Sequence, residues 1–155
     1  MRLRFVFMIF CLLFSLPSFS ANDGSDLFGN WLFYKMIYKG ELMDPLNPKF
    51  VMTFNFQDSG YNTLSFHRID EEGFCERTAL WFYNHEKQEL YQQVTWANPN
   101  NRGDCSSDPD FQVGHESFSP FKYEKDQLYL TVPLADENVV LVWKRLMSVH
   151  HHSGF

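Results

Sequence analysis

Residues 49–57 read KFVMTFNFQ, and this stretch decides the fold. Every second residue in it is phenylalanine or methionine, and the residues between them are Val51, Thr53 and Asn55. Large apolar side chains therefore lie on one face of an extended chain and smaller or polar ones on the other, a pattern that a helix does not give. The stretch predicts a half-buried β-strand.

Seven further segments are short, rich in aromatic and β-branched residues, and separated by turn residues. They are Trp31 to Tyr38, Tyr61 to Arg68, Phe74 to Tyr83, Glu89 to Trp96, Phe111 to Phe118, Gln127 to Val132 and Asn138 to Arg145, with a further short candidate at Phe121 to Glu124. Most connections are too short for crossover helices, so neighbouring strands should pair antiparallel. We predict an all-β fold, a single up-and-down antiparallel barrel of about eight strands. A β-sandwich is the alternative, because periodicity does not separate two packed sheets from one closed sheet.

The start of the chain has the layout of a cleaved export signal in residues 1–20. A cationic start, Met1 to Arg4, precedes an apolar run from Phe5 to Leu16 that is shorter than the roughly 20 residues a membrane-spanning helix needs. Small residues then favour cleavage after Ser20, with Ala21 as the other choice. We expect an exported protein, periplasmic or secreted. An uncleaved anchor is the alternative.

Residues 21–148 are expected to form one barrel domain, and residues 149–155 a flexible C-terminal tail. Cleavage would remove Arg2 and Arg4 from the 13 basic residues and leave all 19 acidic ones, so the net charge of the mature chain would be about −8. Such a charge disfavours nucleic acid as a partner. No transmembrane segment is expected after cleavage, and the pattern does not indicate an oligomeric state.

Two cysteines would remain in the exported chain, because Cys11 lies in the signal. Disulfides persist outside the cytoplasm, so a bridge between Cys75 and Cys105 is the leading interpretation. It would close a loop of about thirty residues and contribute roughly 3 to 4 kcal/mol. Two free buried thiols or a redox pair are the alternatives, although the C-x-x-C spacing of redox pairs is absent.

Two connections are longer than the rest. Residues 40–48 contain Pro45 and Pro48, and in a barrel they would lie as a lid over the mouth. Residues 97–110 are rich in Asn and Asp, whose oxygen atoms are calcium ligands. That loop lacks the order of an EF-hand and is interrupted by two prolines, so a surface loop tethered by the disulfide is favoured over a calcium site.

The two ends of the strand pattern resemble a known family. Gly29-Asn30-Trp31 opens the first strand, and Arg145 closes the last strand after the apolar run Val139 to Trp143. These residues resemble the G-x-W motif and the final arginine of the lipocalins, a calycin-type barrel family, here in a short bacterial form. The resemblance implies a structural role for Gly29, Trp31 and Arg145, with the arginine packed across the tryptophan by a cation–π contact at the base of the barrel.

The family's helix near the C-terminal end and its second, Asp-rich motif have no clear counterpart in this chain. The resemblance also implies binding of a small, largely apolar ligand inside the barrel, as in a carrier or scavenger. The aromatic content of 18 % is consistent with an apolar cavity wall. With Trp31 at the closed base, five side chains are expected to approach the cavity: Phe54, Phe66, Trp81, Val94 and Leu130. The alternative is a filled barrel, in which these side chains form an ordinary core. The protein would then be a cell-envelope interaction protein that acts through its surface loops.

Enzymatic activity is not expected. No G-x-S-x-G serine motif occurs, although His67 and His115 lie in predicted strands where a general base could be assembled. His150 to His152 offer imidazole ligands to a transition metal, but adjacent residues on a flexible end make a poorly organised site. We therefore expect no metal and no cofactor.

Overall fold

The computed structural model describes residues 24–134 and 137–146. The predicted signal in residues 1–20 and the tail with His150 to His152 lie outside the described residues. Among the described residues, no helix has the length and apolar character needed to cross a membrane.

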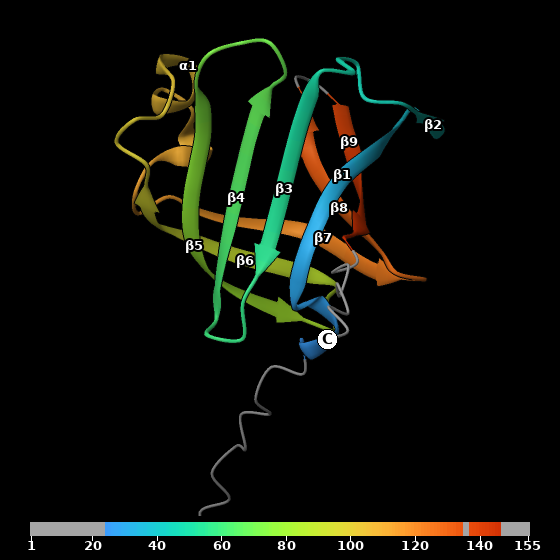
Figure 1. Ribbon diagram of the computed structural model, residues 1–155. Helices are drawn as coiled ribbons and strands as arrows, with labels where there is room; N and C mark the ends of the chain where they lie inside the picture. Colours follow the sequence, from blue (N-terminus) through green and yellow to red (C-terminus); the bar gives the residue numbers. More distant parts are fainter. Residues whose placement is uncertain (1–23, 135–136, 147–155) are drawn as a thin grey trace, which may run out of the picture.

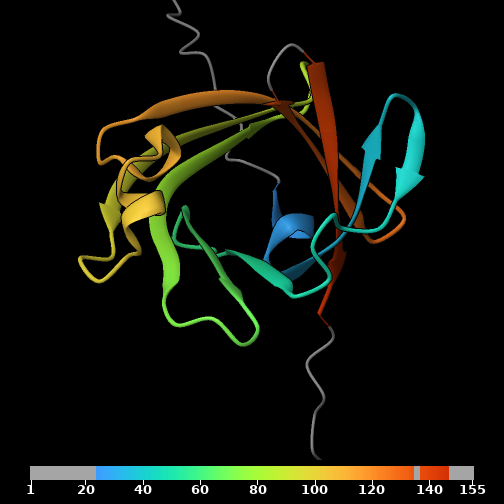
Figure 2. The ribbon, with the colours of Figure 1, turned by 90° about the horizontal axis from the view of Figure 1, so that it is seen from above.

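The chain forms a closed antiparallel β-barrel with one additional strand (Figures 1 and 2). The strands are β1 (Gly29–Tyr38), β2 (Glu41–Met43), β3 (Phe50–Phe56), β4 (Tyr61–Arg68), β5 (Phe74–Asn84), β6 (Glu89–Ala97), β7 (Glu116–Glu124), β8 (Gln127–Leu134) and β9 (Glu137–Arg145). From β3 to β9 each strand pairs with the next, and β1 pairs with both β3 and β9. The pairing of β1 with β9 closes the sheet on itself, so the up-and-down barrel is confirmed and the sandwich alternative is wrong.

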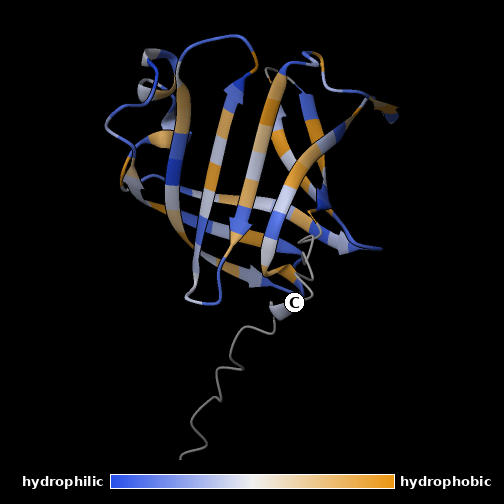
Figure 3. Cartoon of the chain, in the orientation of Figure 1, coloured by the Kyte–Doolittle hydropathy of each residue, from blue (hydrophilic) through white to orange (hydrophobic). Residues whose placement is uncertain are grey.

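The alternation in the sequence appears directly in the burial of the strands. Along β3 the side chains of Met52, Phe54 and Phe56 are buried, and those between them are only partly so. Figure 3 shows the same alternation of hydrophobic and hydrophilic residues around the barrel. Period-two patterning thus places one face of each strand toward the barrel interior.

The strand β2 was not predicted, because it lies inside the connection 40–48. Lys39 and Gly40 have positive φ angles of 52° and 82°, the backbone pattern of a two-residue type I′ hairpin turn. The chain therefore folds back at once and pairs Glu41–Met43 with the end of β1. The predicted lid is not formed: β2 projects from the side of the barrel, and residues 40–48, all of them described, do not border the interior cavity (Figure 2).

The predicted strand Phe111 to Phe118 was also wrong. The side chain of Asp108 accepts a hydrogen bond from the Asp110 amide and starts the 3-10 helix η2 (Pro109–Phe111), which turns Phe111 into the core. The strand β7 begins later, at Glu116, and absorbs the short strand predicted at 121–124. Pro120, which lacks an N–H, lies where the pairing partner of β7 changes from β6 to β8.

The barrel is closed at the end where β1 starts, at the bottom of Figure 1. The 3-10 helix η1 (Ser25–Leu27) crosses this end and is visible through the barrel in Figure 2. The Trp31 indole is fully buried and donates to the Leu27 carbonyl at 2.8 Å. Arg145 donates to the Phe28 carbonyl at 2.6 Å and also to the Asp26 carbonyl. The predicted contact is present, with the guanidinium carbon 4.2 Å from the Trp31 ring centre.

Candidate ligand-binding site

A cavity of about 490 Å³ lies inside the barrel, toward the end opposite η1. This volume falls within the usual range for small-molecule sites, roughly 300 to 1,000 Å³. Most of the wall is aromatic or aliphatic, with a smaller polar part. Its apolar lining consists of Met52, Phe54, Leu64, Phe66, Phe111, Phe118, Leu130, Val132, Pro133, Leu141 and Trp143.

Three of the five side chains expected at the cavity, Phe54, Phe66 and Leu130, border it. Trp81 instead packs at the closed end, where its ring lies 5.0 Å from that of Phe56. Val94 is buried, and its backbone exchanges hydrogen bonds with Gly114 and His115 rather than bordering the cavity. Contact of any of the five with a ligand stays a prediction.

The polar part of the wall centres on Arg77 of β5, which sequence reasoning missed. Arg77 is only 5 % exposed, and it lies on the same inner face of β5 as Cys75 and Ala79. The strand pattern contained the signal for it: in Phe74 to Tyr83, the apolar set that includes Cys75 and Ala79 places position 77 on the inner face.

The Arg77 guanidinium is incompletely paired. Its Nη2 donates to Gln92 Oε1 at 3.5 Å, and Gln92 Nε2 donates to Asn62 Oδ1 at 3.2 Å. Arg77 Nε and Nη1 have no hydrogen-bond partner, and no carboxylate among the described residues lies within ion-pair distance of this side chain. Burial lowers the pKa of Arg77 to about 10, against the opposing influence of Asp110 and Asp108. The barrel therefore holds a buried cation that borders a mainly apolar cavity and that no carboxylate of the described residues contacts directly.

The side of the cavity nearest residues 108–119 carries further polar groups. Asp108, Asp110 and His115 border it, and His115 Nε2 lies 3.4 Å from Asp110 Oδ1. Ser117 and Ser119 also border it, but within the described chain neither serine is hydrogen-bonded to His115. His67, the other histidine considered for a general base, is exposed and does not border the cavity.

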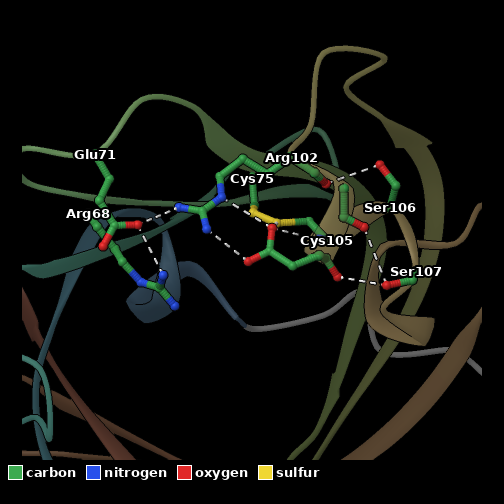
Figure 4. A network of polar contacts seen from close by, with 9 residues as sticks. Arg68, Glu71, Cys75, Arg102, Cys105, Ser106 and Ser107 are labelled. Carbon is green, nitrogen blue, oxygen red and sulfur yellow. Dashed lines mark hydrogen bonds and ion pairs between the residues drawn. A yellow bond between two sulfur atoms is a disulfide. The ribbon is translucent and has the colours of Figure 1, made fainter.

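We call residues 98–115 the cover segment, because it lies between β6 and β7 and contributes Asp108, Asp110, Phe111 and His115 to the cavity wall. It contains the one-turn helix α1 (Gly103–Ser106) and η2. The predicted disulfide between Cys75 and Cys105 is present, with 5.9 Å between the Cα atoms (Figure 4). Both cysteines and Phe111 form a small buried cluster against Leu64 and Phe66. The bridge thus fixes the cover segment to the inner face of β5.

Ion pairs attach the cover segment at a second place, as Figure 4 shows. Arg102 Nη1 donates to Glu71 Oε2 at 3.0 Å, and Arg68 Nη1 donates to the same oxygen at 3.1 Å. These hydrogen bonds from Arg68 and Arg102 hold the pKa of Glu71 below its usual value. Because the groups are exposed, each pair contributes little alone and the network mainly orients the loop.

The polar side chains of residues 97–110 have local structural partners. Asn101 exchanges two hydrogen bonds with the Glu76 backbone, at 2.7 and 2.9 Å, and Asn98 donates to the Glu76 carboxylate. Asp104 accepts two bonds from Arg102. This arrangement is that of a tethered surface loop, the interpretation favoured from the sequence over a calcium site.

The barrel wall is incompletely paired between β7 and β8. The ladder joins Phe121–Glu124 to Gln127–Leu130, and the first half of β7 pairs with β6 only. Residues 131–134 of β8 pair only with β9. The cavity reaches both sides of this seam, at Ser117–Ser119 and at Val132–Pro133. The cavity therefore lies directly behind the unpaired part of this seam.

Comparison of the chain with protein-family models, with curated proteins and with solved structures gave no significant match. The observations that bear on function are consequently the barrel, its cavity and the residues described above.

Proposed function

We propose that this protein is an exported, lipocalin-like carrier or scavenger that binds a small, largely apolar molecule inside its barrel. The observation that supports the proposal is the cavity of about 490 Å³ with its mainly apolar wall. The Gly29, Trp31 and Arg145 cluster at the closed end supports the family resemblance, because each residue has the position and contacts that the lipocalin motif implies.

Packing differs between the two ends of the barrel in a way that suits a container. At the closed end the large side chains of Trp31, Phe56 and Leu128 are at most 1 % exposed. Toward the other end, Phe66, Val132 and Leu141 are only partly buried and border the cavity. A filled base stabilises the fold, so the inward apolar surface above it can be left for a ligand.

The first experiment is native mass spectrometry of the protein purified from the envelope of its own cells, followed by solvent extraction of any bound molecule. A stoichiometric apolar passenger is expected. Titration with fatty acids or haem should also change tryptophan fluorescence, because Trp143 borders the cavity. An empty protein that leaves the fluorescence unchanged with all of these compounds would refute the carrier proposal.

A matched pair of variants tests where such a passenger binds. Leu130→Trp places a larger side chain in the cavity wall and is expected to abolish binding. Leu80→Trp makes the same change at a partly exposed position of β5 that does not border the cavity, and is expected to leave binding unchanged. Equal binding by both variants would place the ligand outside the barrel.

Exposed apolar side chains support a second candidate function, a cell-envelope interaction protein that acts through its surface. Leu42 and Leu46, on the connection between β1 and β3, are 61 % and 77 % exposed. On the outer wall, Phe82 of β5 and Tyr91 of β6 lie in register. Such side chains mark contact surfaces in many proteins. Substitution of Leu42 and Leu46 by Ser should then reduce retention of the protein in its envelope without changing ligand binding.

A further inference from the structure

We propose that the ligand carries a single carboxylate group, and that Arg77 binds this group inside the barrel with Gln92 beside it. The proposal rests on the carrier function and adds the chemical class of the ligand, an apolar molecule with one acidic head. A fatty acid is the simplest molecule of that class.

Burial of the charged Arg77 side chain has a cost in free energy. A charged side chain removed from water is strongly penalised unless it is paired and hydrogen-bonded. Arg77 is only 5 % exposed. Yet its one hydrogen bond within the described part of the chain is a long contact of 3.5 Å to the neutral Gln92. Asp110 and Asp108 act on this guanidinium from a distance, but no carboxylate among the described residues is in contact with it. A bound carboxylate would supply that direct partner.

The unsatisfied groups of the residues that border the cavity are all of one kind. The buried side-chain atoms without a partner in the described part of the chain are Arg77 Nε, Arg77 Nη1, Asn62 Nδ2 and Trp143 Nε1. Of these residues, Arg77 and Trp143 border the cavity, and their unpaired atoms are N–H donors. An ionised carboxylate has only acceptor atoms and suits such a set, whereas an alcohol or amine would bring further donors.

The charges in the cavity wall limit the charge of the ligand. Among the described residues, Arg77 is the only Lys or Arg side chain in the wall, and the other ionisable residues there are Asp108, Asp110 and His115. Because the two aspartates repel any anion, a second negative charge on the ligand is disfavoured, and a single charge placed against Arg77 is favoured over a double one. Phe54, Phe66 and Leu130 line the same space and would contact an apolar body.

The test compares three probes of equal chain length, dodecanoate, dodecanol and dodecylamine, by isothermal titration calorimetry with the disulfide-bonded protein. Dodecanoate is expected to bind about ten- to a hundredfold more tightly than dodecanol, the range for hydrogen bonds to a charged group. Dodecylamine is expected to bind most weakly. Arg77→Met should remove the preference for dodecanoate, whereas Lys122→Met, which deletes an exposed cation outside the cavity, should retain it.

The outcomes separate this proposal from the carrier function. If none of the three probes binds, the carrier function fails and the carboxylate site fails with it. Equal binding of dodecanoate and dodecanol by the unaltered protein would overturn the carboxylate site alone. So would an undiminished preference in Arg77→Met. Arg77→Met is expected to fold, because it removes a buried charge that no carboxylate of the described residues contacts. Should it not fold, the comparison of the three probes with the unaltered protein still tests the carboxylate site.

Discussion

At the scale of single residues, the first position of β1, residue 29, requires a glycine. Its φ angle is 118°, a conformation that other residues adopt only with strain. A Cβ atom there would lie 3.3 Å from Arg145 Nη1, which is hydrogen-bonded to the Phe28 carbonyl. The guanidinium cannot withdraw without weakening that bond. The glycine thus provides both the backbone conformation and the space for Arg145.

This geometry predicts the result of Gly29→Ala relative to Gly40→Ala. Gly40 also has a positive φ, 82°, but nothing lies within 4 Å of the position of its Cβ atom. Both substitutions should cost about 1 kcal/mol of backbone strain, and Gly29→Ala should cost about 1 kcal/mol more because the Arg145 hydrogen bond weakens. Urea unfolding monitored by tryptophan fluorescence measures the difference. Equal losses for the two variants would show that Arg145 is not constrained by this close approach.

At the same scale, the sequence indicates some residues of the candidate site but not others. Phe54 and Phe66 were expected at the cavity because period-two alternation gives the inward face of a strand. Trp81 lies on an inward face too, but its height along the barrel places it at the closed end, and alternation carries no information on height. Arg77 was missed because a charged side chain is ordinarily expected to face solvent, even where the alternation of apolar residues places its position on the inner face of the strand.

At the scale of elements, the disulfide and the hydrogen bonds of Asn101 hold different parts of the cover segment. Arg102 and Asn101 are attached to β5 by main-chain and amide hydrogen bonds, which do not depend on the bridge. Beyond them, Cys105 and Phe111 depend on the buried cluster around the disulfide. Loss of the bridge should therefore release the second part of the segment and leave the first in place.

We predict that replacing both Cys75 and Cys105 by Ala lowers the free energy of unfolding by about 3 to 4 kcal/mol, the loop-entropy contribution of a bridge of this span. Hydrogen exchange should rise in residues 105–113 and stay unchanged in residues 98–102. Asp104→Asn keeps the bridge and weakens an exposed ion pair with Arg102, and the Asn oxygen can still accept the hydrogen bond that the Cys105 amide donates to Asp104, so its cost should stay below about 1 kcal/mol. A double variant as stable as Asp104→Asn would contradict this role of the disulfide.

The elements also show how far the sequence predicts this fold. The positions of β3, β4, β5, β6, β8 and β9 follow closely from alternation and turn residues. The strand β2 was missed because Lys39-Gly40 is an unusual pair for a type I′ turn, which favours Asn-Gly. The error at Phe111 to Phe118 arose because the capping contact of Asp108 overrides a local alternation of apolar residues. Closure of β1 on β9 joins the two ends of the chain, so local patterns only suggest it.

At the scale of the whole molecule, the barrel is asymmetric both along its axis and around its wall. Along the axis, a filled base supports a hollow upper part. Around the wall, β4 is paired on both sides over nearly its whole length, with β3 and with β5. The strand β8 is paired on both sides only up to Leu130. The ladder between β1 and β3 also ends early, at Leu32 and Thr53. The seam between β7 and β8 is therefore one of two parts of the wall that should open at the least cost.

This asymmetry predicts a pattern of amide exchange measured by NMR. Amides in the second half of β8, Thr131–Leu134, that face β7 should exchange through local opening, which costs far less than global unfolding. Amides in the corresponding second half of β4, at Phe66 and His67, should exchange much more slowly, because these residues have partners on both sides. The lower half of β8 should match β4, which gives a comparison within one strand. Uniform protection along β8 would mean that this seam stays closed. A ligand would then have to reach Arg77 at the shorter-paired β1–β3 seam, behind which Met52 borders the cavity, or past the cover segment, which the disulfide restrains.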